Sequence, residues 1–153
     1  MAKRFKGVIY LAAILLSSNV YAADIEILHA WARATAPGQD SAVVDLLLSS
    51  KQTTTLIGAK STLSKSVELH TMQENHGVME MREIKSVQLP AGKVVNFSET
   101  GTHLMLIGLK MPLKEGTNVP LTLLIQVSEK EVQEIKTEAT VKPLVEKAHH
   151  HHH

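Results

Sequence analysis

The sequence predicts an all-β domain, a sandwich or barrel of about nine strands. From Asp24 onward no stretch carries the apolar period of a helix, whereas short runs rich in Val, Ile, Leu and Thr recur. Gly, Pro, Asn and Ser punctuate these runs as short turn signals, none of them long enough to be a domain linker. The pattern therefore indicates one β domain.

The first half of the domain predicts five strands. Ala36-Pro37-Gly38 separates the first from the second, and Pro90-Ala91-Gly92 follows the fifth. The predicted ranges, in chain order, are Ile25–Trp31, Ala42–Ser49, Thr55–Lys60, Val67–Met72 and Val78–Val87.

The second half predicts four more strands. Thr100-Gly101 ends the first of them, and Lys114-Glu115-Gly116 precedes the last two. The predicted ranges are Val94–Phe97, His103–Leu109, Leu121–Val127 and Val132–Val141. Aromatic residues are only 3% of the chain, so we expect a mainly aliphatic core with Trp31 and Phe97 as its large rings.

Both ends of the chain are predicted to lie outside this domain. Residues 1–22 have the pattern of a signal peptide, with a basic start, an apolar run and a small-residue cleavage site at Val20-Tyr21-Ala22. Residues 149–153 are an uninterrupted histidine run, interpreted as an expression tag. Residues 23–148 remain as the domain, with 13 Lys and Arg (16 minus the 3 in residues 1–22) and 15 Asp and Glu, hence a formal charge of −2.

Charge and cysteine content exclude several classes of function. Basic residues alternate with Glu instead of forming a stripe, so we expect no binding to nucleic acid. The chain has no Cys, so we expect neither disulfides nor a lipid anchor on cysteine. The predicted product is a soluble monomer exported to the periplasm, with no membrane anchor.

Methionine and histidine are concentrated in one part of the domain. Apart from Met1, all five methionines lie between positions 72 and 111, as do two of the four histidines outside the terminal run, and His70 lies just before them. Any single methionine there is most simply a core residue. The joint clustering, however, favours a metal site.

Residues 67–82 are predicted to form a β-hairpin with the four residues 74–77 as its loop. With that loop, His70 would lie directly opposite Met81, and Met72 opposite Met79, all four on one face. On another strand His103 and Met105 share a face by the same alternation. Two imidazoles and several thioethers are thus expected to converge.

Such a set of side chains suits a soft cation. Thioether sulfur selects Cu(I) over magnesium, calcium or manganese, and imidazole also binds copper. In an oxidising compartment thioethers have the further advantage that they do not form disulfides. The residues therefore predict Cu(I) as the bound metal.

The spacing His70-x10-Met81-x21-His103-x-Met105 resembles the PCu(A)C family of periplasmic copper chaperones. The resemblance extends to Val-Glu-Leu-His at residues 67–70, Gly-Val-Met-x-Met-Arg at 77–82 and Trp-Ala-Arg-Ala-Thr-Ala-Pro-Gly at 31–38. It implies a cupredoxin-like Greek-key barrel in which His70, Met81, His103 and Met105 bind Cu(I). It also implies delivery of copper to the dinuclear centre of cytochrome c oxidase, through its copper-receiving subunit or another assembly chaperone.

Other classes of function have less support. A blue-copper electron carrier needs a cysteine thiolate, which this chain lacks. No nucleophile elbow, phosphate loop or zinc-protease helix is present in the sequence, so we do not expect an enzyme. A copper buffer or resistance protein, or a supplier to another copper enzyme, remains the alternative to delivery to the oxidase.

Overall fold

The computed structural model describes residues 24–144, and the predicted signal peptide and histidine tag lie outside them. The described part contains ten strands and one short helix, α1, at Phe97–Thr100. The strands are β1 Ile25–Arg33, β2 Ser41–Ser50, β3 Thr54–Lys60, β4 Ser64–Asn75, β5 Val78–Ile84, β6 Val87–Leu89, β7 Val94–Asn96, β8 Thr102–Leu109, β9 Asn118–Ser128 and β10 Glu131–Lys142. The predicted all-β class is confirmed.

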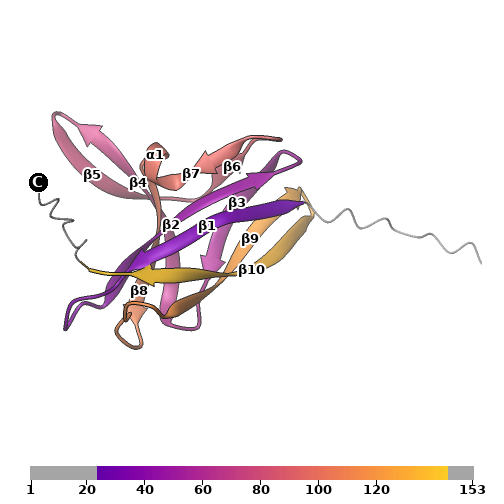
Figure 1. The fold of residues 1–153 in the computed structure, drawn as a ribbon. Helices are drawn as coiled ribbons and strands as arrows, with labels where there is room; N and C mark the ends of the chain where they lie inside the picture. Colours follow the sequence, from indigo (N-terminus) through magenta and orange to yellow (C-terminus); the bar gives the residue numbers. More distant parts are fainter. Residues whose placement is uncertain (1–23, 145–153) are drawn as a thin grey trace, which may run out of the picture.

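All ten strands belong to one sheet, which curls so that β3 and β9 lie behind β1 and β2 (Figure 1). Nine of them follow the order β5-β4-β8-β2-β1-β10-β9-β3-β6, and β7 pairs separately with β2. The contact between β1 and β10 is parallel, and the other strand pairs are antiparallel. The β4–β5 hairpin forms one edge of the sheet and projects from the body of the molecule (Figure 1).

The core is aliphatic, as the composition predicts. Alternate residues of the strands are buried, and Phe97 is the only aromatic ring among the buried residues of the described part. The largest fully buried side chains are Phe97, Leu46, Leu48, Leu56, Leu89, Leu104, Leu106, Leu121, Leu123, Ile125, Val44 and Val119.

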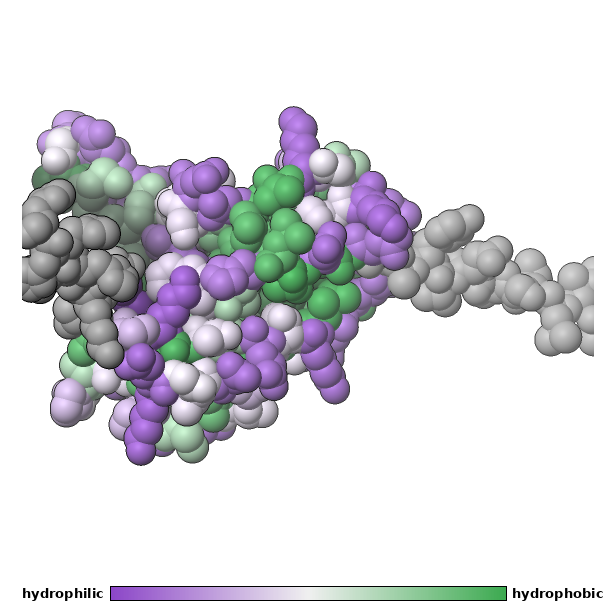
Figure 2. Space-filling model, in the orientation of Figure 1, coloured by the Kyte–Doolittle hydropathy of each residue, from purple (hydrophilic) through white to green (hydrophobic). Residues whose placement is uncertain are grey.

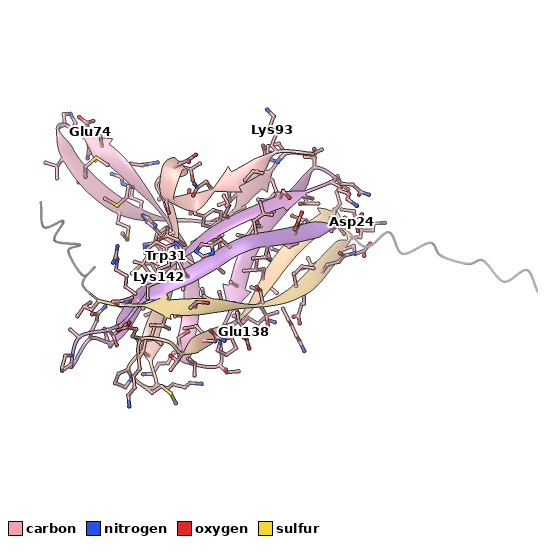
Figure 3. The ribbon with its side chains drawn as sticks, in the orientation of Figure 1. Asp24, Trp31, Glu74, Lys93, Glu138 and Lys142 are labelled. Carbon is pink, nitrogen blue, oxygen red and sulfur yellow. The ribbon has the colours of Figure 1, made fainter. Side chains whose placement is uncertain are left out.

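Trp31 does not lie in this core, so its predicted place there is wrong. On β1 the buried residues are Ala30 and Ala32, and strand alternation turns Trp31 to the outer face. There Lys142 Nζ lies 4.2 Å from the ring centroid (Figure 3), and Arg33 Cζ lies 5.3 Å from it. Both cations hold the ring at the surface through cation–π contacts.

Two predicted strands end differently in the structure. The predicted strand Val78–Val87 is divided into β5 and β6, which pair with different neighbours, β4 and β3. Phe97 starts α1 instead of ending a strand, because the side chain of Asn96 caps the helix by accepting a hydrogen bond from the Ser98 N–H.

The predicted register of the β4–β5 hairpin is wrong by two residues. The loop is His76-Gly77 rather than residues 74–77, and Asn75 pairs directly with Val78. Both loop residues have positive φ, 52° and 80°, as a two-residue hairpin turn of type I′ requires. Met72 is consequently opposite Met81, and His70 is opposite Glu83. Because the shift is an even number, the residues predicted to share a face still do.

On the face shown in Figure 2, apolar residues form a patch over the N-terminal half of β1, and the β4–β5 hairpin also carries exposed apolar residues. Leu28, in that half of the strand, is 44% exposed at a bulge in the pairing with β2. No helix within residues 24–144 has the length and apolar character needed to cross a bilayer.

Candidate metal centre

The two histidines of the predicted site lie directly opposite one another on adjacent strands. His70 of β4 pairs with His103 of β8 in a bulge-free antiparallel register, one pair before its end at Thr71 and Thr102. Directly opposite residues in such a pair have Cβ atoms about 4.5–5.5 Å apart. Their side chains are 17% and 20% exposed, so both rings are largely covered yet reach the surface. The fold therefore brings the two imidazoles together.

The two predicted sulfur ligands flank this histidine pair. Met105 follows His103 by two residues on the same face of β8, opposite Glu68. Met81 lies on β5, two residues from Glu83, the direct neighbour of His70. Met81 is therefore diagonal to His70 instead of directly opposite as predicted, and diagonal neighbours lie about 7–8 Å apart, within reach of a long side chain.

Met81 and Met79 are among the exposed large apolar residues, at 43% and 58%, and sulfur atoms line the hairpin below Glu74 in Figure 3. Met72 is half-buried beside them. Three thioethers thus lie on the hairpin face that also carries His70.

The corner between α1 and β8 sets which residues of β8 face outward. Gly101 ends α1 with φ 68°, a left-handed conformation that glycine adopts readily, and its N–H donates to the Phe97 carbonyl. The Gly101 carbonyl in turn accepts the backbone N–H of Met72 at 2.8 Å, tying the corner to β4. Thr102 then points inward and His103 outward, as their burial shows.

Two carboxylates contact the imidazoles, and neither contact was predicted from the sequence. Glu68 Oε2 is 2.8 Å from Nε2 of His70, and Asp45 Oδ1 is 3.5 Å from Nδ1 of His103. Glu68 could have been found, because it precedes His70 by two residues and so shares its face. Asp45 is 58 residues from His103 in the chain, and only the pairing of β2 with β8 brings them together.

The Nδ1 atoms of the two imidazoles indicate whether these residues fit a metal ion. Among the described residues, Nδ1 of His70 and Nδ1 of His103 are buried without a hydrogen-bond partner. The 3.5 Å contact of His103 with Asp45 is therefore an electrostatic contact and not a hydrogen bond. Buried polar atoms seldom lack partners. A cation accepting the lone pair of His70 Nδ1 would satisfy that atom.

The other histidines and Met111 lie elsewhere. His76 is exposed at the tip of the hairpin, with Nδ1 2.6 Å from the side-chain oxygen of Asn75. His29 is exposed on β1. Met111 is 54% exposed beside Pro112, in the loop after β8. The strand register thus places the four predicted residues on one outward face, with Met105 and Met81 on either side of the histidine pair, and leaves these three elsewhere.

The donor set decides which metal the arrangement suits. Within residues 24–144 no three His, Cys, Asp or Glu side chains are grouped so that they could hold a metal ion. A site that uses both imidazoles would have to complete its shell with methionine sulfur. Imidazole with thioether is a donor set for Cu(I), and not for hard divalent cations.

Two comparisons with known sequences match most of the chain. The family model described as "Putative lipoprotein LpqE-like" matches residues 25–141. A protein of Leifsonia xyli subsp. xyli, also described as a putative lipoprotein, is 31% identical over 116 residues, covering 75% of this chain and 70% of its own.

Solved structures of PCuAC domains share the architecture. The copper-bound PCuAC domain from PmoF2 aligns with a TM-score of 0.62 and 25% identity, covering 80% of this chain and 97% of that domain. The Cu(I) form of DR1885 from Deinococcus radiodurans aligns at 0.60 with 28% identity, covering 82% and 83%. These matches confirm the cupredoxin-like fold and the resemblance to PCu(A)C proteins. The chain belongs to the LpqE-like family and has the fold of the PCuAC domain.

Proposed function

We propose that this protein is a copper carrier that binds one Cu(I) through His70, Met81, His103 and Met105. The observation that carries the proposal is the direct pairing of His70 with His103, with Met105 on the same outward face. Two neutral imidazoles and two neutral thioethers match the softness of Cu(I). The copper-bound PmoF2 domain and the Cu(I) form of DR1885 support this assignment by their shared fold.

The surroundings of the site suit a carrier. The four proposed ligands carry no charge, but Glu68 and Asp45 place carboxylates beside the imidazoles and offset the positive charge of the ion. Met81 is 43% exposed on an edge strand, so an acceptor could reach one side of the ion. Cargo held by partly exposed ligands can be exchanged, which a carrier requires. No catalytic step is part of the proposal.

The proposed destination is the dinuclear copper centre of cytochrome c oxidase, reached through its copper-receiving subunit or another assembly chaperone. Export to the periplasm fits this destination and fits the lipoprotein descriptions of the family and of the Leifsonia relative. The proposed mature domain is residues 23–148, after removal of a signal peptide at 1–22.

Deleting the gene under copper limitation tests the destination. We expect cytochrome oxidase activity to fall and to recover when excess copper is supplied. Complementation with a His103→Ala variant should fail to restore activity at limiting copper, while the wild-type gene restores it. Normal oxidase activity combined with greater copper sensitivity would instead identify a buffer or resistance protein.

A further inference from the structure

Asp45 is a buried carboxylate on the outer face of the sheet. It lies in the middle of β2, where Val44 and Leu46 on either side point into the core, and it is 8% exposed. Burying a carboxylate is costly unless charged or hydrogen-bonding groups surround it. The groups around Asp45 therefore indicate why this residue is tolerated.

Two side chains approach the Asp45 carboxylate from different elements. The hydroxyl of Ser98, in α1, donates a hydrogen bond to Oδ1 at 2.9 Å. From β8, Nδ1 of His103 lies 3.5 Å from the same oxygen. The antiparallel register, in which Val44 pairs with Leu104, places Asp45 beside His103. One oxygen thus links the corner formed by α1 to a proposed copper ligand.

Neighbouring groups hold the carboxylate in this place. Trp31 pairs directly with Asp45 on the β1 side, and Ser98 is fixed because α1 is anchored by the fully buried Phe97. The His103 side chain is 20% exposed and that of Asp45 12%, so the imidazole has more room to turn than the carboxylate. A rotation that closes the 3.5 Å separation by about half an ångström would produce an N–H to carboxylate hydrogen bond of ordinary length.

We infer that Asp45 is a positioning residue for copper binding: its carboxylate accepts the Nδ1–H of His103 and so leaves Nε2 of His103 as the nitrogen that binds Cu(I). This inference rests on the proposed function. Histidine ligands of metals commonly donate their other N–H to a carboxylate, which fixes the tautomer and ring orientation. In this chain the carboxylate comes from β2, a strand that carries none of the four proposed ligands.

The direct test is the tautomer of His103 in the wild-type protein. Nitrogen-15 NMR of the protein lacking residues 149–153 distinguishes the two ring nitrogens of each histidine. We expect Nδ1 of His103 to carry the proton and Nε2 to shift when Cu(I) is added. A proton on Nε2, with copper bound at Nδ1, would overturn the inference whether or not any variant folds.

The Asp45→Asn variant tests the consequence for affinity. Loss of a carboxylate that orients a metal ligand typically weakens metal binding by 10–100-fold, and we expect a loss in that range in a competition titration with Cu(I). We also expect the Nδ1–H signal of His103 to be lost or mixed with the other tautomer, a change that lower stability alone would not produce. Asp40→Asn is the matched control, because it removes one exposed carboxylate from the loop before β2 and should change neither quantity.

Each outcome has a distinct meaning. Wild-type affinity and an unchanged His103 tautomer in Asp45→Asn would overturn the positioning role while leaving the proposed function intact. Failure of the wild-type protein to bind Cu(I) would refute the proposed function, and with it this inference. Ser98→Ala separates the two partners of the carboxylate, because it removes the hydroxyl donor and should retain the His103 tautomer.

Discussion

β8 and β10 follow the same alternation but use their outward faces differently. On β10 the inward residues Ala139 and Val141 are buried, and the outward residues Glu134, Lys136 and Glu138 are exposed charges. On β8 the inward residues Thr102, Leu104 and Leu106 are also buried, but the outward positions include half-buried histidine and methionine. The inward faces of the two strands thus serve stability alike, and the difference that bears on function lies on the outward faces.

The largest expected effect on stability comes from truncating a buried side chain on the inward face of β8. Leu104 is fully buried. In the chain it lies between His103 and Met105, the two residues of β8 that are proposed to bind copper. Leu104→Ala should lower the free energy of unfolding by about 2–5 kcal/mol, the usual loss for a large buried side chain. Urea denaturation measures this loss. On β10, Lys136→Ala is the outward control and should change stability by less than about 0.5 kcal/mol; equal losses for the two variants would contradict the comparison.

On the outward face, removing sulfur should affect copper and not the fold. Met105→Leu and Met81→Leu keep the apolar bulk, so each should cost less than about 1.5 kcal/mol of stability. Each should weaken Cu(I) binding by at least about tenfold, or about 1.4 kcal/mol, in a competition titration. Met111→Leu is the matched control, because Met111 is exposed in the loop after β8. Wild-type affinity in either site variant would remove that residue from the ligand set.

The methionines beside the site should matter less, and the observed register separates them. Met72 pairs directly with Met81 and is half-buried, whereas Met79 is 58% exposed and pairs with Glu74. We expect Met72→Leu to weaken binding by about threefold, or about 0.7 kcal/mol, and Met79→Leu to have a smaller effect on affinity. Both variants should slow transfer to an acceptor, measured by stopped-flow exchange. A loss for Met79→Leu as large as that for Met81→Leu would show that Met79 is a ligand.

The smallest effect is expected on the charged outer face around β10. The hydrogen bond from Lys60 to Glu134, at 2.9 Å, and the charge of Lys60 lower the pKa of the Glu134 carboxyl below 4.5. The stability from this pair is therefore present above pH 4.5 and is lost as the pH falls through the lowered pKa of the folded state. Both side chains are exposed, so the contribution is small.

Glu134→Gln tests this pair by thermal unfolding. We expect a small decrease in Tm at neutral pH that disappears in acid, and unchanged Cu(I) affinity at neutral pH. A Tm decrease that grows as the pH is lowered would contradict the sign of this pKa shift.

Much of the candidate site was predictable because strand alternation is local. His103 and Met105 share a face whatever strands lie beside them, and the hairpin residues kept their common face because the true loop is shorter by two residues. A shift of one residue would have moved Met79 and Met81 to the opposite face from His70. The two-residue turn requires a positive φ at His76, and the residue type alone does not indicate one. The length of the loop was therefore not evident from the sequence.

Contacts between distant strands could not be predicted in the same way. The direct pairing of His70 with His103 and the approach of Asp45 both depend on the order β4-β8-β2 in the sheet. The division of Val78–Val87 into β5 and β6 depends on separate partners at the two ends of that segment. Trp31 was misplaced because its size suggests a core residue, whereas the alternation of β1 puts the small Ala30 and Ala32 inside.

The most direct test of the account is a Cu(I) competition titration of the protein lacking residues 149–153, combined with X-ray absorption spectroscopy of the loaded form. Removing the terminal histidines is necessary because they bind metals themselves. The account predicts one Cu(I) per chain, with both nitrogen and sulfur in its coordination shell, and loss of sulfur scattering in Met105→Leu. No competitive binding of Cu(I), or a shell of nitrogen and oxygen alone, would contradict it.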